Sequence, residues 1–210
     1  MSNYVISISR EFGSGGRMIG KQLAARLGIP CYDRTLIQKT AEKSGLSPEF
    51  IARAEERARS RLHLPFASLG AGLSTYTQQG VPVNLQAFFA QSEVIRELAD
   101  QGPCVIVGRC SDYVLGGRPG CLKVFLWADL DSRVRRCLEE YHLPPAGVEQ
   151  RIRQTDRDRS SYYAHYTGRT WGDMHSFDLT LNTAVTGVDG AVEVIAALVK
   201  ARLSGQEGAE

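Results

Sequence analysis

The chain has 210 residues and a mass of 23.1 kDa, and 43% of its residues are hydrophobic, which is enough for one folded domain with a sizeable core. With 25 Lys and Arg against 23 Asp and Glu, the formal net charge is +2, so the charge balance gives no argument for binding to nucleic acid or to a membrane surface. No apolar run approaches the length of a membrane span, and the first residues lack the basic and apolar segments of a signal peptide, so we expect a cytoplasmic protein.

The cysteines favour the same compartment. Their number is odd and none forms a C-x-x-C pair, while three of them lie in or beside apolar runs. This pattern predicts buried thiols in a reducing compartment. A zinc site needs closer clustering of Cys and His, so we expect none. The cysteines are Cys31, Cys104, Cys110, Cys121 and Cys137.

The first expected elements are a strand, a glycine-rich turn and a helix. Residues 4–9 form a short β-branched run typical of a buried strand. The sequence Gly-Ser-Gly-Gly follows at residues 13–16, and apolar residues then recur at helical spacing from Ile19 to Leu27. Gly28 is a typical residue to end such a helix.

Apolar strands continue to alternate with helices along the rest of the chain. Residues 60–84 combine Gly and Pro with Ser, Thr and Gln, which predicts a mobile loop inside the domain. The alternation indicates an α/β fold whose parallel sheet is covered by helices on both faces. Further strands are expected at residues 29–33, 104–107, 122–127 and 177–181. Further helices are expected around 36–37 and 50–52, at 85–99, after an N-cap at Asp129, and at 191–203.

The strand, glycine-rich turn and helix together predict an anion-binding site. Backbone N–H groups of such a turn point at one ligand, and the helix dipole favours negative charge there. Glycine allows the positive φ angles and the close approach of phosphate oxygens that this geometry needs. A turn whose glycines serve packing alone is the alternative, and we favour phosphate binding because arginines flank the turn. The residues expected at the donor phosphates are Arg10, Gly13, Ser14, Gly15, Gly16 and Arg17.

This turn departs from the usual phosphate-loop pattern G-x-x-x-x-G-K-[ST]. Registering the helix on that of small-molecule kinases puts Gly16 at the lysine position and Arg17 at that of the metal-binding hydroxyl residue. If the loop slips by one residue, Arg17 takes the lysine position instead. We therefore expect Arg17 to neutralise phosphate charge, the alternative being Lys21 or a later arginine. Ser14 is the nearest hydroxyl group for a metal ion.

Four further segments follow in the order found in nucleoside-monophosphate kinases. Residues 31–37 match the second strand and the start of the acceptor-binding segment, and residues 105–109 match the third strand with its Gly-Arg. Residues 156–159 match an arginine-rich lid, and residues 178–183 match the last strand. Together with the Gly-Ser-Gly-Gly-Arg turn, these segments resemble the cytidylate kinase-like family across nearly the whole chain.

The resemblance implies a P-loop kinase fold in one domain, residues 1–210. It implies a five-stranded parallel sheet with the strand order 2-3-1-4-5, flanked by helices. The core is then expected at residues 1–33, 85–145 and 175–203. An acceptor-binding insertion is expected at about 34–84, and a lid at about 146–170.

The resemblance also implies a set of acceptor-binding residues. Arg109 follows a central strand, where ligands bind in open α/β sheets, and is expected to hold the acceptor phosphate. Asp33 is expected near the acceptor, where a carboxylate can also hold metal-bound water. Lys39 and Asp158 complete the expected substrate-binding set.

The lid is expected to supply catalytic arginines. Phosphoryl transfer brings several negative charges together, so cations must converge on them. The candidates for this role, beside Arg17, are Arg153, Arg157 and Arg159. Arg153 and Arg157 are four residues apart and would share a helix face. A solvated helix with local ion pairs is the alternative.

The base-reading residues of cytidylate kinases are incomplete here. Val107 stands in place of the acidic residue before Gly-Arg, Cys110 in place of the Asp after it, and Arg34 in place of an acceptor-binding Ser. Two lid arginines are matched by Gln154 and Ser161. Because buried polar contacts decide which base an enzyme accepts, the acceptor stays open.

The sequence therefore predicts a phosphotransferase that uses ATP and Mg²⁺ and acts on a nucleotide or another small acceptor, with CMP or dCMP as first choice. One alternative is a non-catalytic nucleotide-binding or regulatory protein on a kinase fold. A second is a small-molecule kinase with a non-nucleotide acceptor. No nucleic-acid or membrane partner is expected, and a homodimer is left open.

Overall fold

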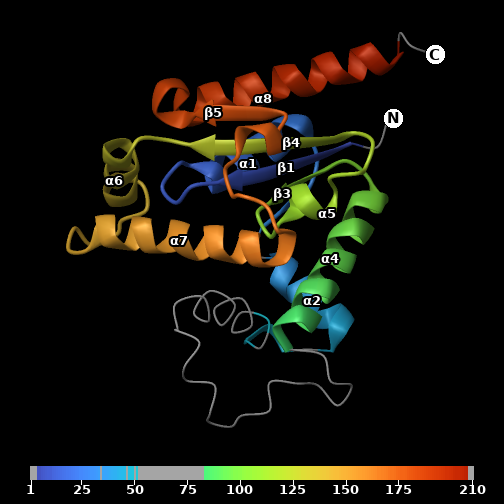
Figure 1. The fold of residues 1–210 in the computed structure, drawn as a ribbon. Coiled ribbons are helices and arrows are strands. Elements are labelled where there is room, and N and C mark those ends of the chain that lie inside the picture. The colour runs from blue at the N-terminus through green and yellow to red at the C-terminus, as the bar shows by residue number, and fades with distance from the viewer. Residues whose placement is uncertain (1–3, 34, 46, 50, 52–82, 208–210) are drawn as a thin grey trace.

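The protein is described from a computed structural model covering residues 4–33, 35–45, 47–49, 51 and 83–207. Its centre is a parallel sheet of five strands in the order β2-β3-β1-β4-β5, which confirms the predicted fold class (Figure 1). The strands are β1 (Val5–Arg10), β2 (Cys31–Tyr32), β3 (Cys104–Val107), β4 (Cys121–Trp127) and β5 (Leu179–Asn182). β1 pairs with both β3 and β4, so the glycine-rich turn leaves from the middle of the sheet.

Helices lie on both faces of this sheet. They are α1 (Gly16–Leu27), α2 (Thr35–Ser44), α4 (Val83–Gln101), α5 (Ser111–Val114), α6 (Leu130–Glu139), α7 (Val148–Thr167) and α8 (Thr183–Glu207). A short 3₁₀ turn, η3 (Met174–Ser176), precedes β5. Within the described ranges, no helix is long and apolar enough to cross a membrane.

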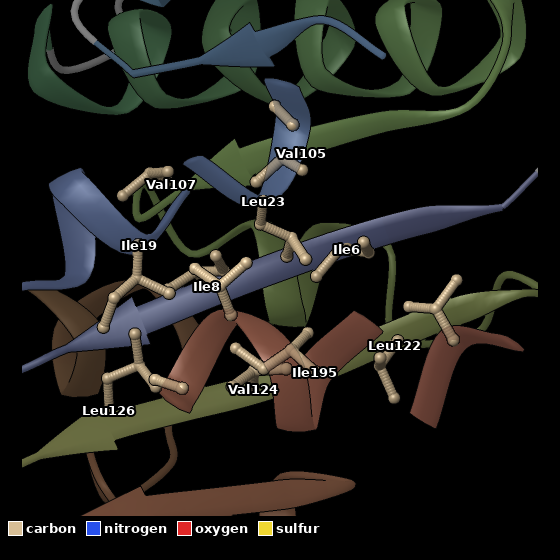
Figure 2. Close-up of a cluster of buried hydrophobic side chains, with 14 residues drawn as sticks. Ile6, Ile8, Ile19, Leu23, Val105, Val107, Leu122, Val124, Leu126 and Ile195 are labelled. Atoms are coloured by element: carbon tan, nitrogen blue, oxygen red, sulfur yellow. The ribbon is translucent and has the colours of Figure 1, made fainter. Parts of the chain in front are cut away.

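One face of the sheet packs against α1 and α8. Ile6 and Ile8 of β1 belong to a buried cluster that includes Leu23 of α1 and Ile195 of α8, and all four side chains are fully buried (Figure 2). Burying a side chain of this size contributes roughly 1.5–3 kcal/mol. The cluster therefore fixes α1 on the sheet, and with it the turn from which α1 begins.

The opposite face packs against α2 and α4. Val5 of β1 and Ile106 of β3 share a second buried cluster with Leu36 of α2 and Ile95 of α4. Because both faces of the central strands are covered, β3 reads as a continuous apolar run, and in β1 even the interspersed Ser7 and Ser9 are buried. This explains why the short runs in the sequence were sufficient to predict both strands.

Two predicted helix boundaries are confirmed. Gly28 ends α1 in the left-handed conformation, with a φ of +65°, and its N–H bonds back to the last turn. Asp129 caps α6, where its carboxylate accepts a hydrogen bond from the Ser132 N–H at 2.8 Å. Both signals are local, so the sequence alone carries them.

The C-terminal elements differ from the prediction in their limits. β5 begins at Leu179 rather than at Phe177, because Phe177 closes the 3₁₀ turn η3, where its N–H bonds to the Met174 carbonyl at 3.3 Å. α8 begins at Thr183 and is interrupted at Gly187, whose φ of +66° and ψ of −174° are not helical. Its second part corresponds to the helix predicted at 191–203. The loop predicted at 60–84 lies almost entirely outside the described residues.

The predicted state of the cysteines agrees with the structure. All five cysteine side chains are unpaired, and all but Cys31 are buried. The apolar contacts of Cys104 and Cys121 place them in the second buried cluster, where they pack as small hydrophobic side chains.

Candidate functional site

The glycine-rich turn has the backbone geometry predicted for an anion site. Gly13 and Gly15 have φ angles of +84° and +82°, which residues with side chains rarely adopt. Gly15 is the N-cap of α1 and offers no side chain to bond the N–H groups of the first helical turn. These N–H groups, at the positive end of the helix dipole, can bind an anion.

The turn is held from behind by α6 and α8. Thr183, at the start of α8, donates its hydroxyl proton to the Ser14 carbonyl at 2.8 Å. Arg136 of α6 donates from its guanidinium to the Gly13 carbonyl at 2.9 Å. Both side chains are buried, so water does not compete for these bonds and the shape of the turn is set before a ligand binds. Sequence reasoning missed both residues, because they are more than 100 positions away from the turn.

A cavity of about 700 Å³ opens beside the turn, at the carboxyl ends of β1, β2 and β3. Small ligands bind at this end of the strands in open α/β sheets, and the volume suits a small molecule. Among the described residues, the cavity is lined by Ser9, Arg10, Arg17, Asp33, Ile37, Gln38, Pro48, Glu49, Gly108, Arg109, Cys110, Thr155, Arg159, Tyr162, Tyr163 and Trp171.

Four of the lining residues are arginines from different segments: Arg10, Arg17, Arg109 and Arg159. Asp33 lies between two of them. Its carboxylate is 2.5 Å from Nε of Arg17 and 3.8 Å from a terminal nitrogen of Arg10. Burial lowers the pKa of Arg10 well below its usual value, and the charges of the other three arginines act in the same direction, whereas Asp33 opposes them. The cluster therefore carries an excess of positive charge that a bound anion would relieve.

Arg109 reaches the cavity from a sharp turn after β3. Gly108, Arg109 and Cys110 have φ angles of +79°, +62° and +54°, so three consecutive residues are left-handed. For residues with side chains this conformation costs on the order of 1–3 kcal/mol, and such strain is concentrated at functional sites. Burial lowers the pKa of Arg109 as well. The structure thus places Arg109 where the sequence predicted it.

The middle of α7 is fastened to the glycine-rich turn. The Asp156 carboxylate accepts a hydrogen bond from the Phe12 N–H at 2.7 Å and also pairs with Arg133 of α6. One turn further along α7, Arg159 donates to the Arg10 carbonyl at 3.0 Å. Asp156, Arg159 and Tyr163 recur at helical spacing, and they form the face of α7 that meets the turn and the cavity.

Other candidate residues of α7 lie outside the cavity lining. Arg153 pairs with Glu149, at 2.8 Å, and its side chain is 55% exposed. Arg157 donates to the Gln154 side chain at 2.7 Å, and Asp158 accepts from the same amide at 2.8 Å. Of the three lid arginines named from the sequence, Arg159 is the one that lines the cavity.

Lys39 and Ser14 also lie away from the lining. The Lys39 ammonium is 6.0 Å from the ring centroid of Tyr32 and is exposed, although its neighbour Gln38 lines the cavity. Ser14 is fully buried, and its hydroxyl donates to the Glu11 carbonyl at 2.9 Å. Its hydroxyl group is therefore engaged in the shape of the turn.

A buried carboxylate lies directly behind the cavity. Asp112 of α5 is 2% exposed and accepts hydrogen bonds from the Ser9 hydroxyl at 3.1 Å and from the Tyr163 hydroxyl at 2.7 Å. Burial raises the pKa of Asp112, while the two hydrogen bonds oppose that rise. Because Ser9 and Tyr163 both line the cavity, Asp112 holds two of its wall residues in place.

Part of the cavity wall is aromatic. Tyr162, Tyr163 and Trp171 line it. Tyr166 stacks on Phe88 of α4, with ring centroids 4.2 Å apart, so α7 and α4 are joined beside the cavity. Tyr162 and Tyr163 of α7 therefore face the candidate ligand site.

The cavity also offers an oxygen ligand for magnesium. Among the described residues, no group of three or more His, Cys, Asp and Glu side chains is placed to hold a metal ion. Mg²⁺ in kinases is held by substrate phosphates, several waters and one or two carboxylates. Asp33, which pairs with Arg17 at the end of the turn, fits this role. The buried Ser14 hydroxyl does not.

Comparisons with known proteins agree with this geometry. The sequence model of the cytidylate kinase-like family matches residues 5–185. A curated relative, the cytidylate kinase of Methanopyrus kandleri, is 22% identical over 204 residues, which are 93% of this chain and 92% of that protein.

Solved structures share the fold. An uncharacterized protein from Eubacterium ventriosum superposes with a TM-score of 0.70 at 24% identity, covering 95% of this chain and 99% of that one. Shikimate kinase from Acinetobacter baumannii, solved in complex with shikimate, gives a TM-score of 0.51 at 14% identity, covering 96% and 95%. The fold is therefore that of P-loop kinases.

Proposed function

The chain belongs to the cytidylate kinase-like family, and on that basis we propose that it transfers the γ-phosphoryl group of ATP to a small acceptor that itself carries a phosphate. CMP and dCMP are the first candidates for the acceptor. The observation that carries the proposal is the cavity lined by four arginines beside the glycine-rich turn. Phosphoryl transfer needs positioning and charge neutralisation more than covalent chemistry, and this cavity offers both.

Each part of the cavity has a role in this proposal. Residues 13–17 and Arg10 bind the donor phosphates at the start of α1, and Arg109 binds the acceptor phosphate from the end of β3. Arg159 approaches from α7 and neutralises charge on the transferred group. Arg153, Arg157, Lys39 and Asp158 stay candidates from the family resemblance, and they have this role only if the lid moves.

The state of Asp33 favours a phosphate over a hydroxyl group as the attacking group. A hydroxyl acceptor needs a general base, and Asp33, which lines the cavity together with Glu49, is already paired with Arg17 and lies near Arg10. A phosphate monoester has its second pKa near 6, so its oxygen attacks at neutral pH without a base. In that reaction the γ-phosphorus–oxygen bond to ADP breaks as the bond to the acceptor oxygen forms. A diphosphate and ADP result.

Magnesium fits the same arrangement. When bound, it would neutralise negative charge on the donor phosphates. Asp33 is the residue that we expect to hold it, through water or directly. The arginines remain the groups that bind and orient the two phosphate-bearing substrates.

The test is a screen for ADP release from ATP with Mg²⁺ present. Purified protein is offered each nucleoside monophosphate and, separately, small hydroxylated acids such as shikimate. Acceptor-dependent ADP formation with CMP or dCMP supports the proposal. ADP formation with the hydroxylated acids alone supports the non-nucleotide alternative, and it overturns the proposed acceptor class.

A second candidate function is favoured by the turn itself. Arg17 stands at the position of the metal-binding hydroxyl residue, and the Ser14 hydroxyl is engaged by the Glu11 carbonyl. A non-catalytic nucleotide-binding protein is compatible with both features. Such a protein binds ATP with an affinity measurable by calorimetry, yet it forms no ADP with any acceptor.

The proposed place of action is the cytoplasm. All five cysteines are unpaired, which suits a reducing compartment. The proposed partners are a nucleotide and a small acceptor, without nucleic acid, because the formal net charge of +2 gives no argument for it.

A further inference from the structure

The stem of Arg10 lies across Gly16, the residue in register with the phosphate-loop lysine. A β-carbon at Gly16 would lie 2.8 Å from both Cβ and Cγ of Arg10, and 3.5 Å from its Cδ. Real β-carbons essentially never approach other atoms so closely. Gly16 therefore leaves room for the Arg10 side chain, and the position that usually projects a lysine is crossed by an arginine from β1.

The other end of Arg10 lies against Gly108. A β-carbon at Gly108 would be 3.0 Å from Cζ of Arg10 and would overlap a terminal nitrogen of the guanidinium. Gly108 follows β3, and its φ of +79° already favours glycine. The Arg10 side chain thus packs against two glycines from separate segments, Gly16 and Gly108. Arg10 also lines the cavity.

Among the residues that the structure describes, little negative charge compensates the Arg10 guanidinium. Its side chain is 16% exposed, and its terminal nitrogen is 3.8 Å from the Asp33 carboxylate, which is beyond hydrogen-bond distance. Three other arginines, Arg17, Arg109 and Arg159, repel it. A cation held in a low-dielectric site with so little compensation is well placed to bind a phosphate.

Arg17 is in a different situation. Its side chain is 44% exposed, and its Nε is 2.5 Å from the same carboxylate, with which it forms a close ion pair. Arg17 extends from the first turn of α1, and its guanidinium pairs with the Asp33 carboxylate. The expectation that Arg17 replaces the lysine has less support from this geometry than the same role for Arg10.

We propose that Arg10 supplies the charge of the missing phosphate-loop lysine, and that Gly16 and Gly108 leave the space that its side chain occupies. The inference rests on the proposed function, since it assumes that the turn binds the phosphates of a nucleotide. Arg10 binds two oxygens of one phosphate through its planar fork, where a lysine offers a point charge. In this proposal the cation comes from the end of β1 instead of the start of α1, and it reaches the same glycine-rich turn.

The first test compares two variants that remove one charge each. Arg10→Met keeps an apolar stem over Gly16, and Arg17→Met is the matched control at the other end of the turn. ADP binding is measured by calorimetry on the full chain, after circular dichroism and thermal unfolding have shown that each variant is folded. We expect Arg10→Met to weaken ADP binding by about ten- to a hundredfold, and Arg17→Met to weaken it less. The reverse order overturns the proposal.

The second test returns the lysine to its usual position. In Arg10→Gly both the Cβ and the Cγ that crowd Gly16 are absent, so Arg10→Gly/Gly16→Lys should recover most of the affinity for ADP that Arg10→Gly loses. Gly16→Lys alone should weaken binding, because the new side chain collides with the Arg10 stem. Recovery in the double variant with loss in the single variant supports the exchange of positions. A double variant that binds ADP no better than Arg10→Gly contradicts it.

Inorganic tripolyphosphate separates this inference from the proposed function. A parent protein that binds ADP but transfers phosphate to no acceptor refutes the proposed transfer, while the order of affinities still decides the role of Arg10. If the parent binds tripolyphosphate but not ADP, the proposed use of a nucleotide is wrong. The affinities of the same variants are then compared with tripolyphosphate as the probe. Equal affinity of Arg10→Met and the parent for the bound probe overturns the inference in either case.

Discussion

The carboxylate of Asp156 in α7 accepts a hydrogen bond from the backbone N–H of Phe12 in the glycine-rich turn, at 2.7 Å. The same carboxylate pairs with Arg133 of α6, so one side chain joins the predicted lid helix to the turn and to a helix that supports it. The side chains of Asp156 and Arg133 are only 15% and 12% exposed. Water therefore competes weakly for these bonds, and the loss of one partner leaves the other charge poorly solvated.

Replacement of Asp156 should destabilise the fold. We expect Asp156→Ala to lower the free energy of unfolding by about 1.5–3 kcal/mol, since a bond from Phe12 and a partly buried ion pair are lost together. Asp158→Ala is the matched control on the same helix, because its carboxylate accepts from Gln154 on the outer side. This control should change the free energy by at most about 0.5 kcal/mol. Urea unfolding of both variants checks the prediction, and equal effects would contradict it.

Arg109 should act on the acceptor more than on ATP. It lines the cavity from the end of β3, on a different segment from the glycine-rich turn. We expect Arg109→Ala to lower kcat/KM for the acceptor by about ten- to a hundredfold, while the affinity for ATP stays nearly unchanged. Steady-state kinetics with varied acceptor, together with calorimetry for ATP, measure the two effects. The assignment is wrong if ATP binding is lost in proportion.

The fold could be predicted because its signals are local. Short apolar runs such as residues 104–107 mark strands that are buried on both faces, and Gly28 and Asp129 mark helix ends by their own backbone preferences. The strand order did not follow from these runs. It came from the resemblance to a family, which carries the long-range pairing of β1 with β3 and β4.

The site could be predicted only in part. Arg109 follows a strand directly, so the strand end gave its position. Spacing indicated correctly that Arg153 and Arg157 share a helix face, yet spacing cannot tell which face turns inward. The contact of Arg136 with the Gly13 carbonyl joins residues 123 positions apart, and it has no local signal. The same holds for Arg10, whose path depends on glycines in two other segments.

The three candidate arginines of α7 should differ in their effect on turnover. Arg159 lines the cavity and donates to the Arg10 carbonyl, whereas Arg153 pairs with Glu149 in solvent. We expect Arg159→Ala to lower kcat by about tenfold or more, and Arg153→Ala and Arg157→Ala to leave it within about twofold. Initial rates at saturating ATP and acceptor give the comparison. A loss in the exposed variants as large as that in Arg159→Ala would show that α7 turns or moves during the reaction.

The buried carboxylate of Asp112 should make stability depend on pH. Its carboxylate accepts hydrogen bonds from Ser9 and Tyr163, and among the described residues it forms no direct ion pair. The charge of Lys123 lowers the pKa of Asp112, but by less than burial raises it. Burial is the largest influence and raises the pKa of Asp112 above its ordinary value. The native state therefore holds the Asp112 proton more tightly than the unfolded chain does.

The sign of the effect follows from this proton. An aspartate in the unfolded chain titrates near pH 3.9, so above about pH 4 the native state binds more protons than the unfolded state until the raised pKa of Asp112 is passed. Through that window the free energy of unfolding falls as the pH rises.

Asp112→Asn removes this titration, so its stability relative to the parent should increase as the pH rises from about 4 to 7. Tyr163→Phe removes a hydrogen bond that lowers the pKa of Asp112, so it should extend the fall to higher pH. Urea unfolding at half-unit pH steps measures all three proteins, and a relative stability of Asp112→Asn that decreases with pH would refute the argument.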